Sequence, residues 1–420
     1  MKIIYILIFI FTFSFLVYSQ EAQFYKIAVD VESNISGGVL SLEEIVRTAD
    51  QLNIDALILG DEFYNKFEYG IGPGPFKYLF KKTVISDSVC EYGLKSYLDL
   101  IEELNAKYPQ VLLIEGFEVS PYYWWRGSFF KRNLQLIDWH RQFIVTGLTY
   151  DDYNNLPITS KGNSKYSQYS GDLWFEPYQD FIDFIDSRGG LTFWAHPDES
   201  YNENINGINA FTQHYPQILS KTNNYTGFCI LFGGYSDTGK FSGIWDDLLM
   251  SYCRGERTHP VWAIGELDYT EASEIKRMDD LLNFVRALGK KREEIFAALK
   301  NGRMHVSWNL HRQGIYLSDF HLTDNSSQKK AFSADTLDIL GDVSLVVRLK
   351  VENDLDPSLV INVLKNGELF DIKEVSTAPG KVVEVIIDDK VSDNKKGYYR
   401  IEINYQGGKI ISNPIFFRKI

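Results

Sequence analysis

Acidic side chains and one imidazole follow short apolar runs at several points of this sequence. The apolar runs have the composition of buried parallel strands. A cluster of carboxylates with one imidazole suits a hard divalent cation, Mn²⁺ or Mg²⁺, better than Zn²⁺. The pattern therefore predicts a metal or polar substrate site formed by Asp30, Glu32, Asp61, Glu62, Glu118, His196 and Asp268.

Spacing supports the clustering of the first four acids. Asp30 and Glu32 are two residues apart on a predicted strand, so their side chains point to the same face. Asp61 and Glu62 follow the next strand, which lies beside the first if sequential strands are neighbours. Carboxylates in such a group repel one another unless a cation or a proton lies between them. For any single residue, a helix cap or a loop contact is the competing interpretation.

Alternating strands and helices must position these side chains. Helical patterns separate the predicted strands, and the capping box of Ser41 and Glu44 opens the first of them. Two further helices are expected near 276–288 and 291–300. The alternation predicts a parallel sheet covered by helices, and seven units favour a closed barrel over an open doubly wound sheet. A barrel places its active site at the C-terminal ends of its strands. The seven predicted strands are 25–31, 55–60, 110–115, 142–147, 190–195, 226–232 and 260–265.

The pattern changes near Gly314, after which no long helical segment is expected. Apolar and polar residues alternate over 343–351 and 399–405, and Asn366-Gly367 is a hairpin signal. We therefore expect an α/β barrel domain over 24–312 and a small all-β sandwich domain over 315–420.

The N-terminus predicts export. Lys2 precedes an apolar run, 3–17, that is shorter than the roughly 20 residues of a membrane span. We expect residues 1–19 to be a signal peptide, a secreted or periplasmic protein, and no stable membrane insertion after cleavage. A retained anchor is the alternative.

Charge and cysteine content narrow the partners. The net charge of −13 argues against a nucleic-acid partner, whose binding relies on clustered Lys and Arg. The three cysteines are too widely spaced for a zinc site or a disulfide framework. A small molecule, such as a sugar or a phosphoester, is the expected partner.

Several of these segments together resemble the PHP (polymerase and histidinol phosphatase) family, in particular its secreted branch with a β-sandwich after the barrel. The resemblance implies a metal-dependent hydrolase of phosphoesters. It covers most of residues 25–312, with the matching segments in the family's order. They are Gly60-Asp61-Glu62, Gly116-Phe117-Glu118, Ala195-His196-Pro197, Asp268-Tyr269-Thr270 and Gly302-Arg303.

The metal motifs are degenerate. Family members begin with His-x-His where this chain has Asp30 and Glu32, and they carry histidine where it has Glu62 and Thr270. A ligand histidine of the fourth strand corresponds to Gln142, and a frequent acid of the sixth to Cys229. Because carboxylates also bind metals, the exchanges predict a histidine-poor, carboxylate-rich site.

Other residues could contact a substrate. Trp124 and Arg126 belong to an aromatic segment after Glu118 that could stack on a sugar or another ring, or could be a packed loop. Arg303 is the third candidate for substrate binding. We expect the histidines other than His196 to be structural or exposed.

Three functions are compatible with these observations. The first is a divalent-metal-dependent phosphoesterase, and the second is an inactive relative that uses the same pocket to bind a ligand. The third is a surface module whose working part is the sandwich.

Overall fold

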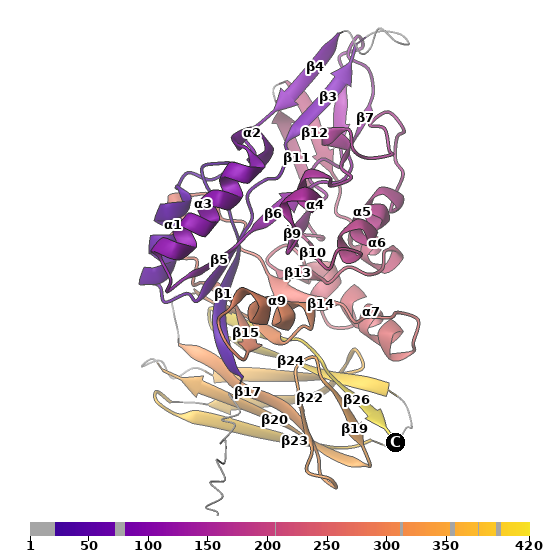
Figure 1. The fold of residues 1–420 in the computed structure, drawn as a ribbon. Coiled ribbons are helices and arrows are strands. Elements are labelled where there is room, and N and C mark those ends of the chain that lie inside the picture. The colour runs from indigo at the N-terminus through magenta and orange to yellow at the C-terminus, as the bar shows by residue number, and fades with distance from the viewer. Residues whose placement is uncertain are drawn as a thin grey trace, which may run out of the picture.

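The computed structural model describes residues 22–71, 80–205, 207–310, 314–352, 358–376, 378–391 and 396–420. The predicted signal peptide, residues 1–19, lies outside the described residues. Figure 1 shows a mixed α/β part above a layered set of C-terminal strands.

Two sheets form the centre of the α/β part. The first contains three neighbouring parallel strands. Two more strands extend it at one side, and each of them is antiparallel to the strand before it. The second contains five strands, and each sheet is buried along most of its length. In the first sheet they are β1 (Gln23–Val31), β2 (Ala56–Leu59), β5 (Leu112–Ile114), β15 (Leu281–Ala287) and β16 (Met304–Asn309). In the second sheet they are β6 (Gly116–Val119), β9 (Phe143–Thr146), β10 (Leu191–Trp194), β13 (Gly227–Leu231) and β14 (Trp262–Gly265).

The predicted strands all occur close to their expected positions, but the closed ring of seven is not shown. The run at 110–115 divides into β5 and β6, which belong to different sheets. Strand β9 is antiparallel to both of its neighbours, β6 and β10. The two edge strands of the second sheet, β14 and β6, contact the ends of β1 and β2, where the Leu267 amide donates to Val29 O (2.9 Å) and the Phe63 amide donates to Glu118 O (2.9 Å).

Helices cover the outer faces of the two sheets. Figure 1 shows α1 and α3 on one side and α5, α6 and α7 on the other. The capping box predicted at Ser41 and Glu44 opens α1. The longer helices are α1 (Leu42–Gln51), α3 (Leu94–Lys107), α5 (Glu176–Asp186), α7 (Ile244–Cys253) and α9 (Arg292–Lys300). The short ones are α2 (Val89–Tyr92), α4 (Tyr150–Asn154), η2 (Thr159–Lys161), α6 (Pro216–Lys221), η3 (Tyr235–Gly239) and α8 (Ala272–Ile275).

The prediction of a helix near 276–288 is wrong. Residues Leu281–Ala287 form β15, which pairs with β1 on one side and β16 on the other. A strand buried on both faces is an apolar run that periodicity alone does not distinguish from a buried helix. The Asn283 side chain binds both backbone groups of Gly265 at 2.8 Å, so β15 also fixes the end of β14.

Inserted strands lie above the C-terminal ends of the central strands (Figure 1). They form a four-stranded sheet and a hairpin, neither of which was expected from the sequence. The sheet contains β7 (Trp124–Arg126), β8 (Gln135–Ile137), β11 (Tyr201–Ile205) and β12 (Ile208–Thr212), and the hairpin contains β3 (Lys66–Gly70) and β4 (Lys81–Ile85).

The described residues after Gly314 contain strands and no helix. Strands of two sheets enclose a second hydrophobic core that includes Leu322, Val347 and Ile401. One of these sheets continues into the first part of the chain, because β25 pairs with β16. The strands are β17 (Ile315–Asp324), β18 (Lys330–Phe332), β19 (Thr336–Ile339), β20 (Asp342–Val351), β21 (Ser358–Lys365), β22 (Glu368–Ser376), β23 (Val382–Lys390), β24 (Lys396–Tyr405), β25 (Gly408–Ser412) and β26 (Ile415–Lys419).

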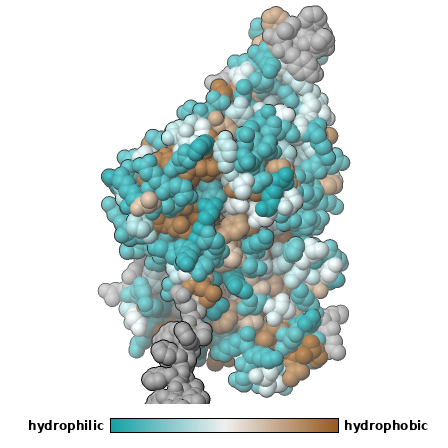
Figure 2. All heavy atoms as spheres, viewed as in Figure 1, coloured by the Kyte–Doolittle hydropathy of each residue, from teal (hydrophilic) through white to brown (hydrophobic). Residues whose placement is uncertain are grey.

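The visible surface is largely hydrophilic, with apolar residues in scattered patches (Figure 2). Across the described residues, no helix has the length and apolar character required to cross a bilayer.

Candidate functional site

The strand ends bring most of the predicted residues to one place. A carboxylate oxygen from each of Glu32, Glu118 and Asp268 lies within 4.8 Å of the other two. Glu32 follows β1, Glu118 lies in β6 and Asp268 follows β14, so three distant segments supply the three oxygens. Glu32 and Glu118 are buried, whereas Asp268 is exposed as a residue although its carboxyl group is largely shielded from water. This spacing is compatible with one cation bound by all three carboxylates.

Backbone strain marks the same strand ends. Asp30, His196 and Asp268 have positive φ angles of 69°, 27° and 49°. Residues with a side chain seldom adopt this region, and such strain is concentrated at functional sites because the surrounding structure must hold it in place. Asp30 lies where the pairing of β1 with β2 shifts register, between Val29 and Val31, whereas His196 and Asp268 lie in the turns after β10 and β14.

Close packing of the strands leaves room for Asp30 only because its neighbour is glycine. A Cβ atom on Gly60 would lie 1.7 Å from Asp30 Oδ1. Asp30 itself is fully buried, with 0% exposure. The glycine after β2 thus allows a carboxylate to enter the space between β1 and β2.

Glu266 is a member of the site that the sequence prediction missed. Its Oε1 accepts a hydrogen bond from the His196 amide (2.9 Å), and its Oε2 lies 3.9 Å from His196 Nδ1. Glu118 Oε1 is also 3.9 Å from His196 Nδ1. The signal was present, because Glu266 follows β14 directly and precedes Asp268 by two residues.

The expectation that His140 is merely structural or exposed also needs correction. His140 Nδ1 lies 3.0 Å from His196 Nε2, and the His140 ring stacks on Tyr201 at 3.6 Å between centroids. Gln142 donates to Glu62 Oε1 at 2.9 Å. Both residues precede β9, and because β9 is antiparallel to its neighbours, its N-terminal end meets their C-terminal ends.

Asp61 has a different environment from the other acids. Its oxygens accept hydrogen bonds from the Ser33 amide (2.8 Å), the Ser36 hydroxyl (2.7 Å) and the Tyr97 hydroxyl (2.7 Å). The Ser33 hydroxyl donates as well. These protein donors already bind the lone pairs of the carboxylate, so Asp61 fixes the turn after β1 instead of offering a free ligand atom.

Burial and mutual repulsion raise the pKa of the clustered carboxyl groups. Loss of hydration comes first, and the neighbouring acids add to it. The pKa of Glu32 rises to about 8, and those of Glu62 and Asp268 rise to about 7. The pKa values of Asp30, Glu118 and Glu266 rise well above their ordinary range for the same reasons. Burial lowers the pKa of His196 well below its usual value, so its imidazole is neutral.

Several buried polar atoms of the cluster have no hydrogen-bond partner among the residues that the structure describes. Buried polar groups without partners are rare in native proteins, and a bound ion or water accounts for many of them. A neutral imidazole and several carboxylates are suitable ligands for Mn²⁺ or Mg²⁺, so the residues fit a divalent cation. The unpartnered atoms are Asp30 Oδ1, Asp30 Oδ2, Glu118 Oε1, Gln142 Oε1, His196 Nδ1 and Glu266 Oε2.

The three predicted substrate-binding residues do not join this cluster. Arg303 lines a cavity at the start of β1, whereas the acids lie at its end. Arg126 is exposed and binds Gln135. Trp124 is nearer, but its indole N–H donates to Asp138 (3.0 Å) and no carboxylate of the cluster contacts it among the described residues. Pairing of β7 with β8 explains both placements, because it directs this segment into the inserted sheet.

A small cavity opens beside the cluster. Its volume is about 190 Å³, and its lining includes His196, Glu199, Glu266 and Asp268. The residues after β10, β13 and β14 therefore leave limited space next to the acids.

The metal-free protein should lose stability as the pH rises from about 6.5 to 8. In this window the folded protein retains protons on acids such as Glu32, whereas the unfolded chain has released them, so the free energy of unfolding falls with rising pH. Histidines with lowered pKa, such as His196, oppose this trend near pH 6.5, where the unfolded imidazole is still partly protonated, and contribute little slope above about pH 7.5. Urea unfolding in chelator across this window measures the effect.

Glu32→Gln provides the comparison. Removing one group whose pKa is raised should flatten the dependence of stability on pH. Equal slopes for the two proteins would show that Glu32 is hydrated and ionised throughout.

No protein-family model matches the chain, and no curated protein matches it. Among solved structures, the chain is similar to a two-domain protein from Bacteroides vulgatus that is described as containing a predicted PHP-like metal-dependent phosphoesterase. The two sequences are 16% identical. The match covers 91% of this chain and 90% of the other, with a TM-score of 0.41. Conclusions about this chain therefore rest on its own residues.

Proposed function

We propose that the chain binds a divalent cation, Mn²⁺ or Mg²⁺, at the carboxylate cluster and hydrolyses a small phosphoester there, as a PHP-like protein. The observation that carries the proposal is the set of buried, unpartnered oxygens on Asp30, Glu118 and Glu266. Six residues would hold the cation, namely Asp30, Glu32, Glu118, His196, Glu266 and Asp268. Glu62 lies at the edge of this group, bound to Gln142.

A bound cation would supply two effects, a lower pKa for water and stabilisation of charge on substrate oxygens. Side chains of the protein orient the groups that would hold the cation. Asp61 and its hydroxyl partners hold the turn that carries Glu32, and Ser36 and the Gly37 amide orient the Glu32 carboxylate at 3.1 and 2.9 Å. His140 fixes the orientation of the His196 ring by the contact between their nitrogens. Such outer contacts hold metal ligands in place.

The small volume of the cavity beside the cluster favours a second candidate, a binding domain without catalysis. The cavity of about 190 Å³ beside the cluster is smaller than the 300–1,000 Å³ typical of sites for small-molecule ligands. In this alternative the cation has a structural role, and the surrounding surface binds a ligand without converting it. Export, the domain boundary near 312–315 and a small-molecule partner stay predictions in both cases.

Exchange of Glu118 for glutamine tests the metal site. The amide is buried without needing a proton, whereas keeping the Glu118 carboxyl protonated near pH 7 costs about 1.4 kcal/mol for each pH unit above its ordinary pKa, so the metal-free variant should be more stable than the wild type by about 1–3 kcal/mol. The same change removes a ligand. Millimolar Mn²⁺ should therefore raise the melting temperature of the wild type by mass action and leave that of Glu118→Gln nearly unchanged.

Glu103→Gln, an exposed change on α3, is the matched control and should retain the full response to Mn²⁺. Calorimetry measures binding directly. An equal metal response in wild type and Glu118→Gln would place the cation elsewhere, and no response in either would remove the cation from the proposal.

A further inference from the structure

A second cavity, of about 800 Å³, lies between the α/β part and the C-terminal strands. Its walls come from β1, β15 and β16 on one side and from β17 and the residues after β18 on the other. It opens at the start of β1, whereas the carboxylate cluster lies at the end of that strand. Its volume falls within the range of small-molecule sites.

Arg286 gives the cavity a positive charge without a counter-ion. The Arg286 guanidinium lies 4.0 Å from the centroid of the Phe332 ring, and no ion pair of Arg286 occurs among the described residues. Stacking holds the guanidinium plane while its N–H edge stays available for a planar anion. The two acids of the cavity already have cationic partners, Asp319 with Arg348 at 3.1 Å and Asp335 with Arg303 at 3.9 Å.

His305 is a second, independent indication of a ligand. It lines the cavity, it is 2% exposed, and its Nε2 has no hydrogen-bond partner within the described parts of the chain. The rings of Phe284 and Phe24 hold the imidazole, each at 5.0 Å between centroids. Burial lowers the pKa of His305 to about 3, so the ring is neutral and its Nε2 can donate or accept one hydrogen bond, depending on the tautomer.

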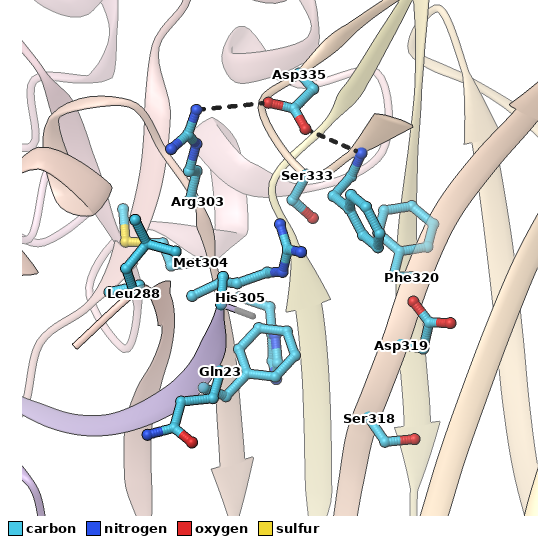
Figure 3. Close-up of a pocket in the computed structure, with 15 residues that line it drawn as sticks. Gln23, Leu288, Arg303, Met304, His305, Ser318, Asp319, Phe320, Ser333 and Asp335 are labelled. Carbon is cyan, nitrogen blue, oxygen red and sulfur yellow. Dashed lines mark hydrogen bonds and ion pairs between the residues drawn. The ribbon is translucent and has the colours of Figure 1, made fainter. Parts of the chain in front are cut away.

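The rest of the cavity combines ring surfaces with small polar groups. Figure 3 shows Arg303 and Asp335 at one end of the hollow, and Gln23 and Ser318 at the other. Phe24 and Phe332 supply aromatic surface. An amide, hydroxyl groups and aromatic rings around one guanidinium without an acidic partner among the described residues, that of Arg286, match a ligand that has hydroxyl groups, a ring and one negative charge.

We infer that this cavity binds an acidic sugar, with the carboxylate of the sugar on Arg286 and its ring against the aromatic wall. His305 and the hydroxyl groups of the rim would contact the sugar hydroxyls. The inference does not depend on the metal site or on hydrolysis, because no residue of the cluster contributes to this cavity.

Titration calorimetry with D-glucuronate and D-glucose tests the assignment, because the two sugars differ only in the carboxylate. The wild-type protein should bind glucuronate saturably and glucose at least about tenfold more weakly, the effect of a charge-assisted hydrogen bond. Arg286→Gln should weaken glucuronate binding by about tenfold or more, and Arg286→Lys, which keeps the charge but loses the planar fork, should have an intermediate affinity.

Arg277→Gln is the control, since Arg277 is exposed and lies outside the cavity. Melting curves establish that each variant is folded. Glucuronate binding that survives Arg286→Gln, or equal affinity for glucose, overturns the assignment. Inorganic phosphate that binds as tightly as glucuronate would also overturn it, because the ring would then contribute nothing.

Discussion

Replacement of Arg400 by methionine is expected to lower the free energy of unfolding by about 3–5 kcal/mol, the range for breaking one partner out of a buried ion pair. Arg400 in β24 is fully buried. Its guanidinium donates to both oxygens of Asp246 at 2.8 and 2.7 Å and to Glu402 at 2.8 Å. Without the guanidinium, Asp246 stays buried with no cationic partner among the described residues, and Glu402 keeps only Lys409, at 3.7 Å.

Chemical unfolding measures the loss, with Arg418→Met as the control. Arg418 forms a similar bidentate pair with Asp338, but both side chains are exposed, so we expect a change of less than about 1 kcal/mol. If Arg400→Met is no more destabilising than Arg418→Met, the network around Asp246 is hydrated in solution.

Replacement of His196 by alanine is expected to reduce phosphoester hydrolysis by about 100-fold or more, because it removes a proposed ligand of the cation, and loss of even the outer contacts of a metal site typically costs about 10–100-fold. The His196 ring lies between Glu118 and Glu266 on one side and His140 on the other. Its backbone amide also holds Glu266, and alanine retains that contact. The variant should therefore fold while it loses the ring that the cluster surrounds.

Initial rates on a panel of phosphomonoesters and phosphodiesters, with Mn²⁺ or Mg²⁺ present, measure the effect. His259→Ala, an exposed histidine remote from the cluster in the sequence, should match the wild type. A wild-type protein without activity on any substrate favours the binding domain. Equal rates for wild type and His196→Ala would mean that hydrolysis takes place elsewhere.

The strand ends could be predicted because the sequence of a buried strand is an apolar run, and Asp30, Glu118 and His196 follow or close such runs. Strand direction was not predictable in the same way. The apolar run of β9 is compatible with a parallel or an antiparallel strand. Only its antiparallel pairing with β6 and β10 shows that residues before it, such as His140, reach the site.

Other misses have related causes. The apolar run of β15 fits a buried helix as well as a strand, and its two partner strands decide between them. Asp61 and Asp30 are both acids after strands, but the donors Ser33, Ser36 and Tyr97 surround only Asp61. Side-chain partners brought from distant segments therefore determined which acids have free oxygens.

The pairing of β16 with β25 has a consequence for how the protein can be divided. A fragment that ended near residue 312 would expose the backbone hydrogen-bonding groups along one edge of β16. Unprotected edge strands recruit other chains and promote aggregation. The C-terminal strands thus act as a cap for the sheet that carries Asp30, so we expect a fragment that lacks them to aggregate.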